Sequence, residues 1–275
     1  MGKQVISVGS LFAGIGGIEK GLEDAKHERY EFKTAWQVEC DPYAQAVLKK
    51  HWPDCGRWDD VRTFPPAPTE DWRVDVVCGG FPCTDISNAG KRAGIDGEQS
   101  GLWREYIRIV RTLRPSYVVV ENVAALLDRG VGRVLGDLAA SGYDAEWEVL
   151  SACAFGAPHS RERLFIIAHA SSDGRNCWFH RDRKHEADSQ GQEDTGTQGQ
   201  RRLWTELSAI FRAGNWDGMR ARRLGRSNGI SDRVDRLRTL GNAVVPEVAT
   251  RIGGRILVAI DRENFTCQTP FLVSR

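Results

Sequence analysis

The sequence lacks any long apolar run, and no stretch of its 275 residues offers enough uninterrupted apolar side chains to span a bilayer. Its first residues, MGKQVISVGSLFAG, lack the basic stretch and long apolar run of a secretory signal. Internal repeats are absent, and 41% hydrophobic and 27% charged residues fit an ordinary globular protein. We therefore expect a cytoplasmic protein without membrane contact, built as one large domain or as a domain with a smaller lobe.

The sequence also lacks a large net charge and a cysteine spacing typical of disulfide-bonded proteins. The formal net charge is +1, so any affinity for nucleic acid must come from local clusters of Arg and Lys. The seven cysteines are odd in number and have no framework spacing. This pattern favours reduced thiols, of which one can be reactive.

From Gln4 to about His169, short apolar runs alternate with amphipathic stretches. This alternation predicts βα units around a mostly parallel sheet. The expected strands are Val5–Phe12, Phe32–Glu39, Val74–Gly79, Tyr117–Asn122, Glu146–Leu150 and Leu164–Ala168. The expected helices are Gly17–Ala25, Pro42–His51, Leu102–Arg114, Val131–Ser141 and, near the end of the sequence, Glu247–Ile260.

The composition changes after His169. The segment from Ser171 to Arg202 has few aliphatic residues and cannot form a core by itself, so it is expected to be a loop-rich insertion. Ten arginines lie between Arg175 and Arg226, interleaved with aromatic residues. This region is where contacts with a polyanion are expected.

A glycine-rich turn, FAGIGG, follows the first expected strand at Phe12–Gly17. Such a turn lets a cofactor approach the backbone at a helix N-terminus. The pyrophosphate-binding pattern G-x-G-x-x-G is not met, because Glu19 stands where its third glycine would fall. A nucleotide-like ligand without a pyrophosphate fits better, and Glu39, at the end of the second expected strand, could accept hydrogen bonds from ribose hydroxyls. A tight turn beside a solvated carboxylate is the non-functional alternative.

Cys83 is the cysteine with the most distinctive surroundings. It follows an apolar strand within Gly79–Ser87, GGFPCTDIS, and the carboxyl ends of such strands are where α/β sheets place ligands. Pro82 stiffens the turn, which would hold the thiol in a cleft. A buried, inert cysteine is the alternative, and the other six cysteines are assigned to that class.

Three later segments bring polar groups to the same edge. Glu121 ends the next expected strand, so its carboxyl and the thiol of Cys83 form a mechanistic pair. Arg161 and Arg163 alternate, so both point to one face and could hold a carboxylate, a phosphate or a base carbonyl, or could form surface ion pairs. Asn242 occupies a turn, GNAVVP, before the last helix.

These motifs occur in the order found in DNA cytosine-5 methyltransferases, and the chain resembles that family, particularly its shorter phage and bacterial members. The match runs from Leu11 to about Arg163 and again from Leu240 to Pro246. The resemblance implies an α/β fold with a mostly parallel, Rossmann-like methyltransferase sheet, helices on both faces and a small irregular target-recognition lobe. Residues 1–170 and 238–275 would form the S-adenosylmethionine-binding catalytic domain, and residues 171–237 the target-recognition region.

The resemblance also implies roles for individual residues. The catalytic positions are Cys83, Glu121, Arg161 and Arg163. The S-adenosylmethionine site comprises Phe12, Ala13, Gly14, Gly16, Gly17, Glu39, Asp60, Val61, Pro82 and Asn242. Two departures stand out: His159 replaces the usual glutamine ahead of the arginine pair, and Arg233–Leu237 is only a brief substitute for the long motif that precedes the GN turn.

The implied reaction is methylation of C5 of cytosine in double-stranded DNA, through addition of Cys83 to C6 of a base flipped out of the duplex. Ser87 and the glycine-rich loop Asn88–Gly101 suit a segment that closes over DNA. The candidate contacts with phosphates and guanine edges are Arg220, Arg222, Arg223 and Arg226. Double-stranded DNA is the expected partner; no obligatory protein partner is expected, although a restriction endonuclease could be paired genetically.

Other readings keep part of this pattern. A tRNA cytosine-5 methyltransferase would share the motif layout, and a nucleic-acid-binding relative that has lost catalysis would share the fold. A metal-binding module on Cys177, His180 and His185 is the weakest reading, because paired C-x-x-C ligands are missing. We expect no metal.

Overall fold

The computed structural model describes residues 2–82, 102–157, 159–170 and 243–268 of the chain. Within these ranges, seven strands form one sheet in the order β3-β2-β1-β4-β5-β7-β6. The strands are β1 (Gln4–Leu11), β2 (Tyr30–Val38), β3 (Gly56–Trp58), β4 (Val76–Gly79), β5 (Tyr117–Val123), β6 (Tyr143–Ser151) and β7 (Glu162–Ala170). The helices are α1 (Gly17–Asp24), α2 (Pro42–His51), α3 (Trp103–Leu113), α4 (Leu126–Arg129), α5 (Val131–Ala139) and α8 (Pro246–Gln268), with short 3-10 turns at Thr69–Trp72 and Ala152–Phe155.

Strand direction defines the functional edge of the sheet. The strands β1 to β5 pair in parallel, whereas β7 runs antiparallel to both of its neighbours. The order along the chain reverses at β1, which has β2 on one side and β4 on the other. In open α/β sheets, a crevice for ligands lies outside the carboxyl ends of the strands at such a reversal.

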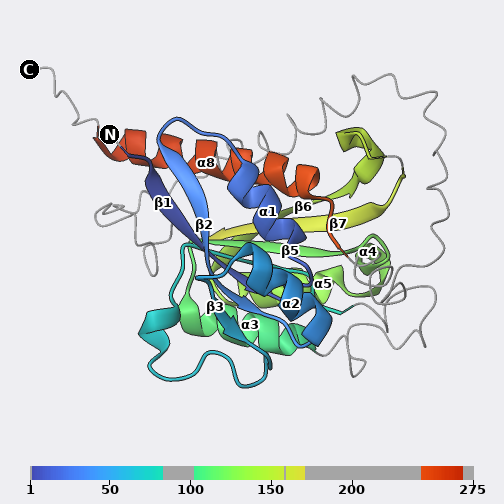
Figure 1. Ribbon diagram of the computed structural model, residues 1–275. Coiled ribbons are helices and arrows are strands. Elements are labelled where there is room, and N and C mark those ends of the chain that lie inside the picture. Colours follow the sequence, from blue (N-terminus) through green and yellow to red (C-terminus); the bar gives the residue numbers. More distant parts are fainter. Residues whose placement is uncertain (1, 83–101, 158, 171–242, 269–275) are drawn as a thin grey trace, which may run out of the picture.

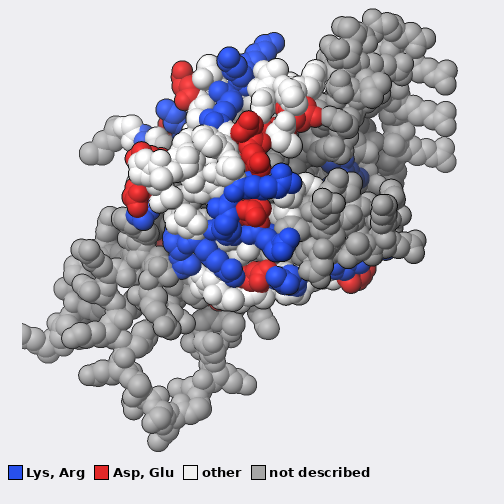
Figure 2. All heavy atoms as spheres, turned by 90° about the horizontal axis from the view of Figure 1, so that it is seen from below, with Lys and Arg blue, Asp and Glu red and all other residues white. Residues whose placement is uncertain are grey.

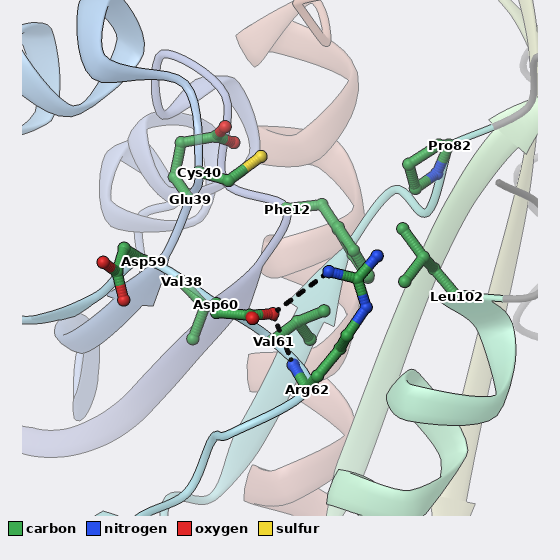
Figure 3. Close-up of a pocket in the computed structure, with 10 residues that line it drawn as sticks. All are labelled: Phe12, Val38, Glu39, Cys40, Asp59, Asp60, Val61, Arg62, Pro82 and Leu102. Atoms are coloured by element: carbon green, nitrogen blue, oxygen red, sulfur yellow. Dashed lines mark hydrogen bonds and ion pairs between the residues drawn. The ribbon is translucent and has the colours of Figure 1, made fainter.

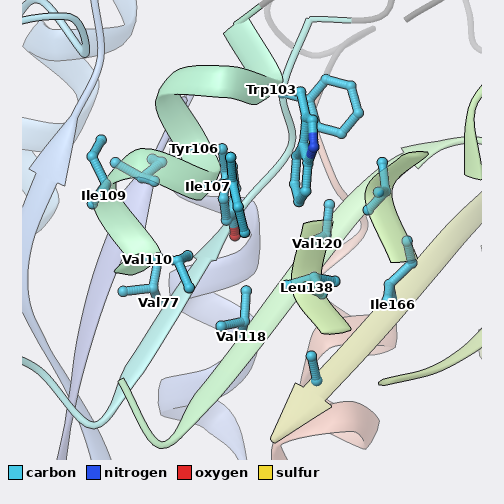
Figure 4. Close-up of a cluster of buried hydrophobic side chains, with 14 of the residues drawn as sticks. Val77, Trp103, Tyr106, Ile107, Ile109, Val110, Val118, Val120, Leu138 and Ile166 are labelled. Carbon is cyan, nitrogen blue, oxygen red and sulfur yellow. The ribbon is translucent and has the colours of Figure 1, made fainter. Parts of the chain in front are cut away.

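Helices cover both faces of the sheet, as Figure 1 shows, with α1 and α8 on one side and α3 and α5 on the other. Alternating side chains of β5 supply both layers: Val118 and Val120 pack towards α3, while Val119 packs towards α8. The layer under α3 contains the fully buried rings of Trp103 and Tyr106 (Figure 4). Fully burying an aliphatic side chain such as Val118 or Val120 contributes about 1.5–3 kcal/mol, so these two layers hold the edge of the sheet in place.

The predicted elements agree with the structure in kind and in position. The predicted helix Pro42–His51 has the bounds of α2: Asp41 caps it by accepting hydrogen bonds from the amides of Tyr43 (2.9 Å) and Ala44 (3.2 Å), and Pro42 suits the first turn. The strand predicted at Leu164–Ala168 is longer and includes Arg163. Prediction missed β3, α4 and the two 3-10 turns, whose three or four residues are too few to show a period.

No helix in the described part of the chain has both the length and the apolar character needed to cross a membrane.

Candidate active site

The turn after β1 has the backbone conformation that its glycines permit. Gly14 and Gly16 adopt φ angles of 56° and 86°, and Phe12 also lies in the left-handed region at 54°. The Ala13 amide donates a hydrogen bond to the carbonyl oxygen of Val38 (3.1 Å), which ties the turn to the end of β2. Residues with a Cβ atom rarely adopt positive φ angles, so Gly14 and Gly16 are needed for the shape of the turn.

Glu39 holds this turn from the neighbouring strand. One carboxylate oxygen, Oε2, accepts the amide of Gly14 at 2.7 Å, and the other, Oε1, accepts the amide of Asp41 at 2.8 Å. Each oxygen keeps acceptor capacity for one further donor. Glu39 can therefore shape the turn and still receive a hydroxyl group of a ligand.

A cavity of about 330 Å³ opens beside this turn. Figure 3 shows its lining, which comes from the ends of β1 and β2, the segment after β3, the end of β4 and the start of α3. Five residues predicted for the cofactor site line the cavity: Phe12, Glu39, Asp60, Val61 and Pro82. The predicted Ala13, Gly14, Gly16 and Gly17 are absent from the lining, but they form the adjacent turn.

Sequence reasoning missed other lining residues, namely Val38, Cys40, Asp59, Arg62 and Leu102. Most of them flank predicted residues, and this adjacency was the available signal. Arg62 is tied to Asp60 twice, through its amide (3.0 Å to Oδ1) and its guanidinium group (3.7 Å to the same oxygen). Asp60 therefore faces the cavity with its carboxylate held in place.

The apolar surfaces and hydrogen-bond acceptors that line the cavity fit an adenosyl cofactor. Phe12, Val61 and Leu102 offer apolar surface for a flat base, and carboxylates of Glu39 and Asp60 offer acceptors for hydroxyl and amino groups. Carboxylates near the cavity also suit a ligand that carries the positive charge of a sulfonium. Backbone amides of a phosphate-binding turn are not required for such a ligand.

The last helix reaches the same region. A Cβ atom on Gly17 would lie 2.4 Å from the carbonyl oxygen of Val244, and one on Gly21 would lie 2.3 Å from that of Pro246. Gly17 thus serves the close approach of the 243–246 segment to α1. The predicted Asn242 precedes this segment and lies outside the described residues.

The carboxyl ends of β4 and β5 form a second corner, next to the cavity. Oε2 of Glu121 would lie 2.5 Å from a Cβ atom on Gly80, so the absence of a side chain at Gly80 admits the carboxyl group. Asn122 donates a hydrogen bond from Nδ2 to the carbonyl oxygen of Phe81 (3.1 Å). These contacts fix Glu121 against the strand end that leads, through Pro82, into Cys83.

Arg163 reaches Glu121 from the antiparallel neighbour β7. Arg163 pairs in register with Val123, two residues beyond Glu121, so the two side chains are diagonal neighbours on one face. The Nε atom of Arg163 lies 3.0 Å from Oε1 of Glu121. Burial raises the pKa of Glu121 to about 6, although the positive charges of Arg163 and then Arg161 lower it. The carboxyl group can therefore exchange a proton near neutral pH.

Several residues that were predicted from the sequence lie outside the described part of the chain. Cys83, Ser87, Arg220, Arg222, Arg223 and Arg226 lie outside the described residues, as do Cys177, His180 and His185. His159 is exposed. Within the described ranges, no group of three or more His, Cys, Asp or Glu side chains could hold a metal ion.

The sheet order, with one reversed strand beside an edge and a ligand cavity at the β1–β4 reversal, defines an α/β methyltransferase fold. The solved methyltransferase EhMeth of Entamoeba histolytica has this fold: its TM-score is 0.64, with 94% of this chain and 99% of that chain covered at 14% identity. A family model described as C-5 cytosine-specific DNA methylase matches residues 6–210. The chain belongs to this family.

Similarity to individual relatives is concentrated in part of their length. The Type II methyltransferase M2.BsuMI of Bacillus subtilis (strain 168) is 34% identical over 185 residues, which are 64% of this chain and 45% of that protein. The Type II methyltransferase M.Bsp6I of Bacillus sp. (strain RFL6) is 34% identical over 169 residues, 59% of this chain and 52% of the relative. The chain therefore spans about half the length of the curated relatives it matches.

Proposed function

We propose that this protein transfers a methyl group from S-adenosylmethionine to C5 of cytosine in double-stranded DNA. The observation that carries this proposal is the corner at the ends of β4 and β5. There, a buried Glu121, paired with Arg163, packs against Gly80, three residues before Cys83. Family membership supports the same reaction, since the matching model describes cytosine-specific C-5 DNA methylases.

In this proposal, residues of the cavity beside the FAGIGG turn would hold S-adenosylmethionine, which would supply an electrophilic methyl group and keep the electron pair of the broken S–C bond. Glu39 and Asp60 line this cavity; Glu39 would accept hydrogen bonds from the ribose hydroxyls, and Asp60 would accept one from the amino group of the base. Phe12 and Val61 would flank the base, and Pro82, which lines the cavity, directly precedes Cys83 in the sequence. Asn242 would complete the site from the segment that approaches Gly17.

Cys83 makes cytosine reactive. C5 of cytosine is a poor nucleophile, so the ring must first accept a nucleophile at C6. The Cys83 thiolate forms a bond with C6, and the displaced π electrons make C5 an enamine carbon that takes the methyl group. A base then removes the C5 proton; the released electron pair restores the C5–C6 double bond as the sulfur leaves as thiolate.

Glu121 and Arg163 handle the charge that appears during addition. A protonated Glu121 donates a hydrogen bond to N3 and stabilises the charge that develops there. Arg163 binds the carbonyl oxygen O2, and Arg161 adds positive charge beside it. When Arg163 turns from the carboxylate to the base, Glu121 loses the partner that most lowers its pKa. Substrate binding therefore favours the protonated carboxyl that the reaction needs.

The duplex must release the target base into this corner, which costs a few kcal/mol and requires compensating contacts. We propose that Ser87 and the Asn88–Gly101 loop supply contacts near the base. The segment 171–237, with Arg220, Arg222, Arg223 and Arg226, supplies contacts with phosphates and base edges. Residues 1–170 and 238–275 then form the catalytic domain.

Bisulfite sequencing of DNA from cells that express the protein tests this proposal, with a Cys83→Ala variant as the matched control. We expect protected cytosines in one sequence context in the wild-type sample and none in the variant sample. Bisulfite sequencing of tRNA from the same cells forms the second arm. Protection confined to tRNA would replace DNA by tRNA as substrate, and protection in neither polymer would refute the proposal.

A further inference from the structure

One side of the protein carries arginines to which the proposed chemistry gives no direct role, although one of them, Arg62, also lines the cavity and holds Asp60. Figure 2 views the molecule from the side where α3 lies in Figure 1, and Lys and Arg side chains cross this surface with carboxylates between them. We define the arginine band as Arg62, Arg104, Arg108, Arg111 and Arg133. We propose that the arginine band binds the sugar-phosphate backbone of duplex DNA that flanks the target cytosine.

The helix α3 creates the centre of the band. Arg104, Arg108 and Arg111 recur at the i, i+4 and i+7 spacing that places side chains on one helical face. The opposite face of α3 is buried in the core, with Trp103, Tyr106, Ile107, Val110 and Leu113. The arginines therefore point outward by the same periodicity that anchors the helix.

Contacts with neighbouring segments place the two remaining arginines beside α3. Arg108 donates hydrogen bonds from Nη2 to the carbonyl oxygens of Val61 (2.9 Å) and Phe64 (2.6 Å), which brings Arg62 to one side of the helix. On the other side, Asp137 of α5 accepts from Trp103 Nε1 (2.9 Å) and from Arg133 Nε (2.8 Å). The band thus crosses α3 from the segment after β3 to α5.

Charge pairing leaves two arginines in surplus. Asp60 pairs with Arg62, Glu105 with Arg108, and Asp137 with Arg133. Within the described ranges, no carboxylate forms an ion pair with Arg104 or Arg111, and both residues are exposed. Arg111 uses its Nε to bind Ser141 Oγ (2.9 Å), which orients the rest of the guanidinium group. Among the described residues, α3 of a chain whose net charge is only +1 thus carries two arginines without an ion-pair partner.

The spacing and chemistry of this pair favour a nucleic-acid backbone. Seven residues of helix separate Arg104 from Arg111 by about 10.5 Å along the axis, a distance over which one strand of a duplex presents about three phosphates. All members of the band are arginines, whose planar guanidinium groups suit bidentate contacts with phosphate. Position also fits, because α3 begins directly after Leu102, which lines the cofactor cavity. Only the identity of the polymer rests on the proposed function.

The test measures the affinity of the full chain for poly(dA)·poly(dT), a duplex without cytosine, as a function of salt. An Arg104→Gln, Arg111→Gln double variant removes two charges with little effect on helix propensity. We expect the slope of log affinity against log salt to shrink in magnitude by about 1.8, or about 0.9 for each lost phosphate contact. A Lys49→Gln, Lys50→Gln variant loses the same charge from the exposed end of α2 and should keep the wild-type slope.

An Arg104→Lys, Arg111→Lys variant retains the charge and should restore most of the slope, and thermal unfolding shows whether each variant remains folded. Equal slopes in the wild type and the α3 variant, or equal losses in the α3 and α2 variants, would overturn the proposal. So would an effect seen with single-stranded RNA but not with the duplex. Because the probe contains no cytosine, this result is independent of whether the protein methylates DNA.

Discussion

Two regions of the protein each bury a carboxyl group, but the neighbouring side chains are neutral in one region and positively charged in the other. Glu19, in the first turn of α1, accepts a hydrogen bond from Gln37 Nε2 at 3.2 Å and interacts with the hydroxyl group of Ser10, and both neighbours are neutral. Glu121, at the end of β5, has Arg163 as its ion-pair partner and Arg161 nearby. Burial raises the pKa of Glu19 to about 7 and that of Glu121 to about 6.

The different neighbours of Glu19 and Glu121 indicate different roles for the two carboxyl groups. Burial favours the protonated carboxyl of Glu19, and its neutral neighbours, which lower its pKa only in part, bring no positive charge to hold it ionised. The group is enclosed between α1 and the sheet, where we expect it to support packing. The arginines of Glu121 can exchange that carboxyl for another acceptor, and Gly80 leaves room beside it. Activity should therefore respond to changes around Glu121, and stability to changes at Glu19.

Cys83→Ala should produce the largest effect, because the strand end beside Glu121 leads into this thiol. We expect methyl transfer to be abolished, with cofactor affinity nearly unchanged, since the thiol serves mainly addition to C6. Radiolabelled methyl transfer to DNA and calorimetry with S-adenosylmethionine measure the two properties. DNA with 5-fluorocytosine at the target should trap wild-type protein as a covalent adduct, and turnover by the variant would refute the mechanism.

Glu121→Gln tests the chemical half of the comparison directly. We expect a loss of about a hundredfold or more in turnover, because the amide cannot deliver a proton to N3. Glu19→Gln is the matched control, with the same change at the other buried carboxyl, and its turnover should stay near that of the wild type. Single-turnover kinetics measure both variants; equal losses would mean that the comparison is wrong.

Glu19→Gln tests the structural half through pH. A folded-state pKa raised from 4.5 to about 7 means that the contribution of Glu19 to stability is complete below about pH 4.5 and is lost as pH rises towards 7. This loss amounts to about 3 kcal/mol, and glutamine cannot undergo it. The stability of Glu19→Gln relative to wild type should therefore rise by about 3 kcal/mol between about pH 4 and about pH 8. Urea unfolding at both values measures it, and a difference independent of pH would contradict the assignment.

Glu39→Gln should have the smallest effect of these substitutions. It sharpens the comparison because Glu39 combines a structural role with a proposed role in binding the cofactor. It accepts the amides of Gly14 and Asp41 and also lines the cavity. We expect S-adenosylmethionine to bind about tenfold more weakly, equivalent to about 1.4 kcal/mol, because one acceptor becomes an amide donor. Calorimetry measures the dissociation constant, and an unchanged value would limit Glu39 to shaping the turn.

The sequence predicted the main elements of the fold because their signals are local. Apolar runs of strand length and helical spacing predicted β1, β5 and α2, and Pro42 indicated where α2 begins. The antiparallel direction of β7 could not be predicted from its apolar pattern, because alternation carries no information on strand direction. The three residues of β3 are too short for any periodic signal.

The site was predicted unevenly for a similar reason. Phe12, Glu39 and Asp60 were recognisable from motifs, and Arg62 directly follows the predicted Val61, whereas Leu102 lines the cavity only because distant segments meet there. The pairing of Glu121 with Arg163 depends on the register of β5 and β7, which only the folded sheet defines. Burial of Glu19 was missed because a charged residue in a first helical turn is usually solvated.

The contact of Gly17 with the carbonyl oxygen of Val244 has a consequence for biosynthesis. The FAGIGG turn, which contains Gly17, emerges early during translation. Its packing partner, Val244, emerges only after the whole segment between them has been made. Contacts so distant along the chain form late, because the entropy of closing the loop must be overcome first. On the ribosome, a nascent chain would therefore lack the support that the 243–246 segment gives to the glycine-rich turn and α1 until Val244 and Pro246 have emerged.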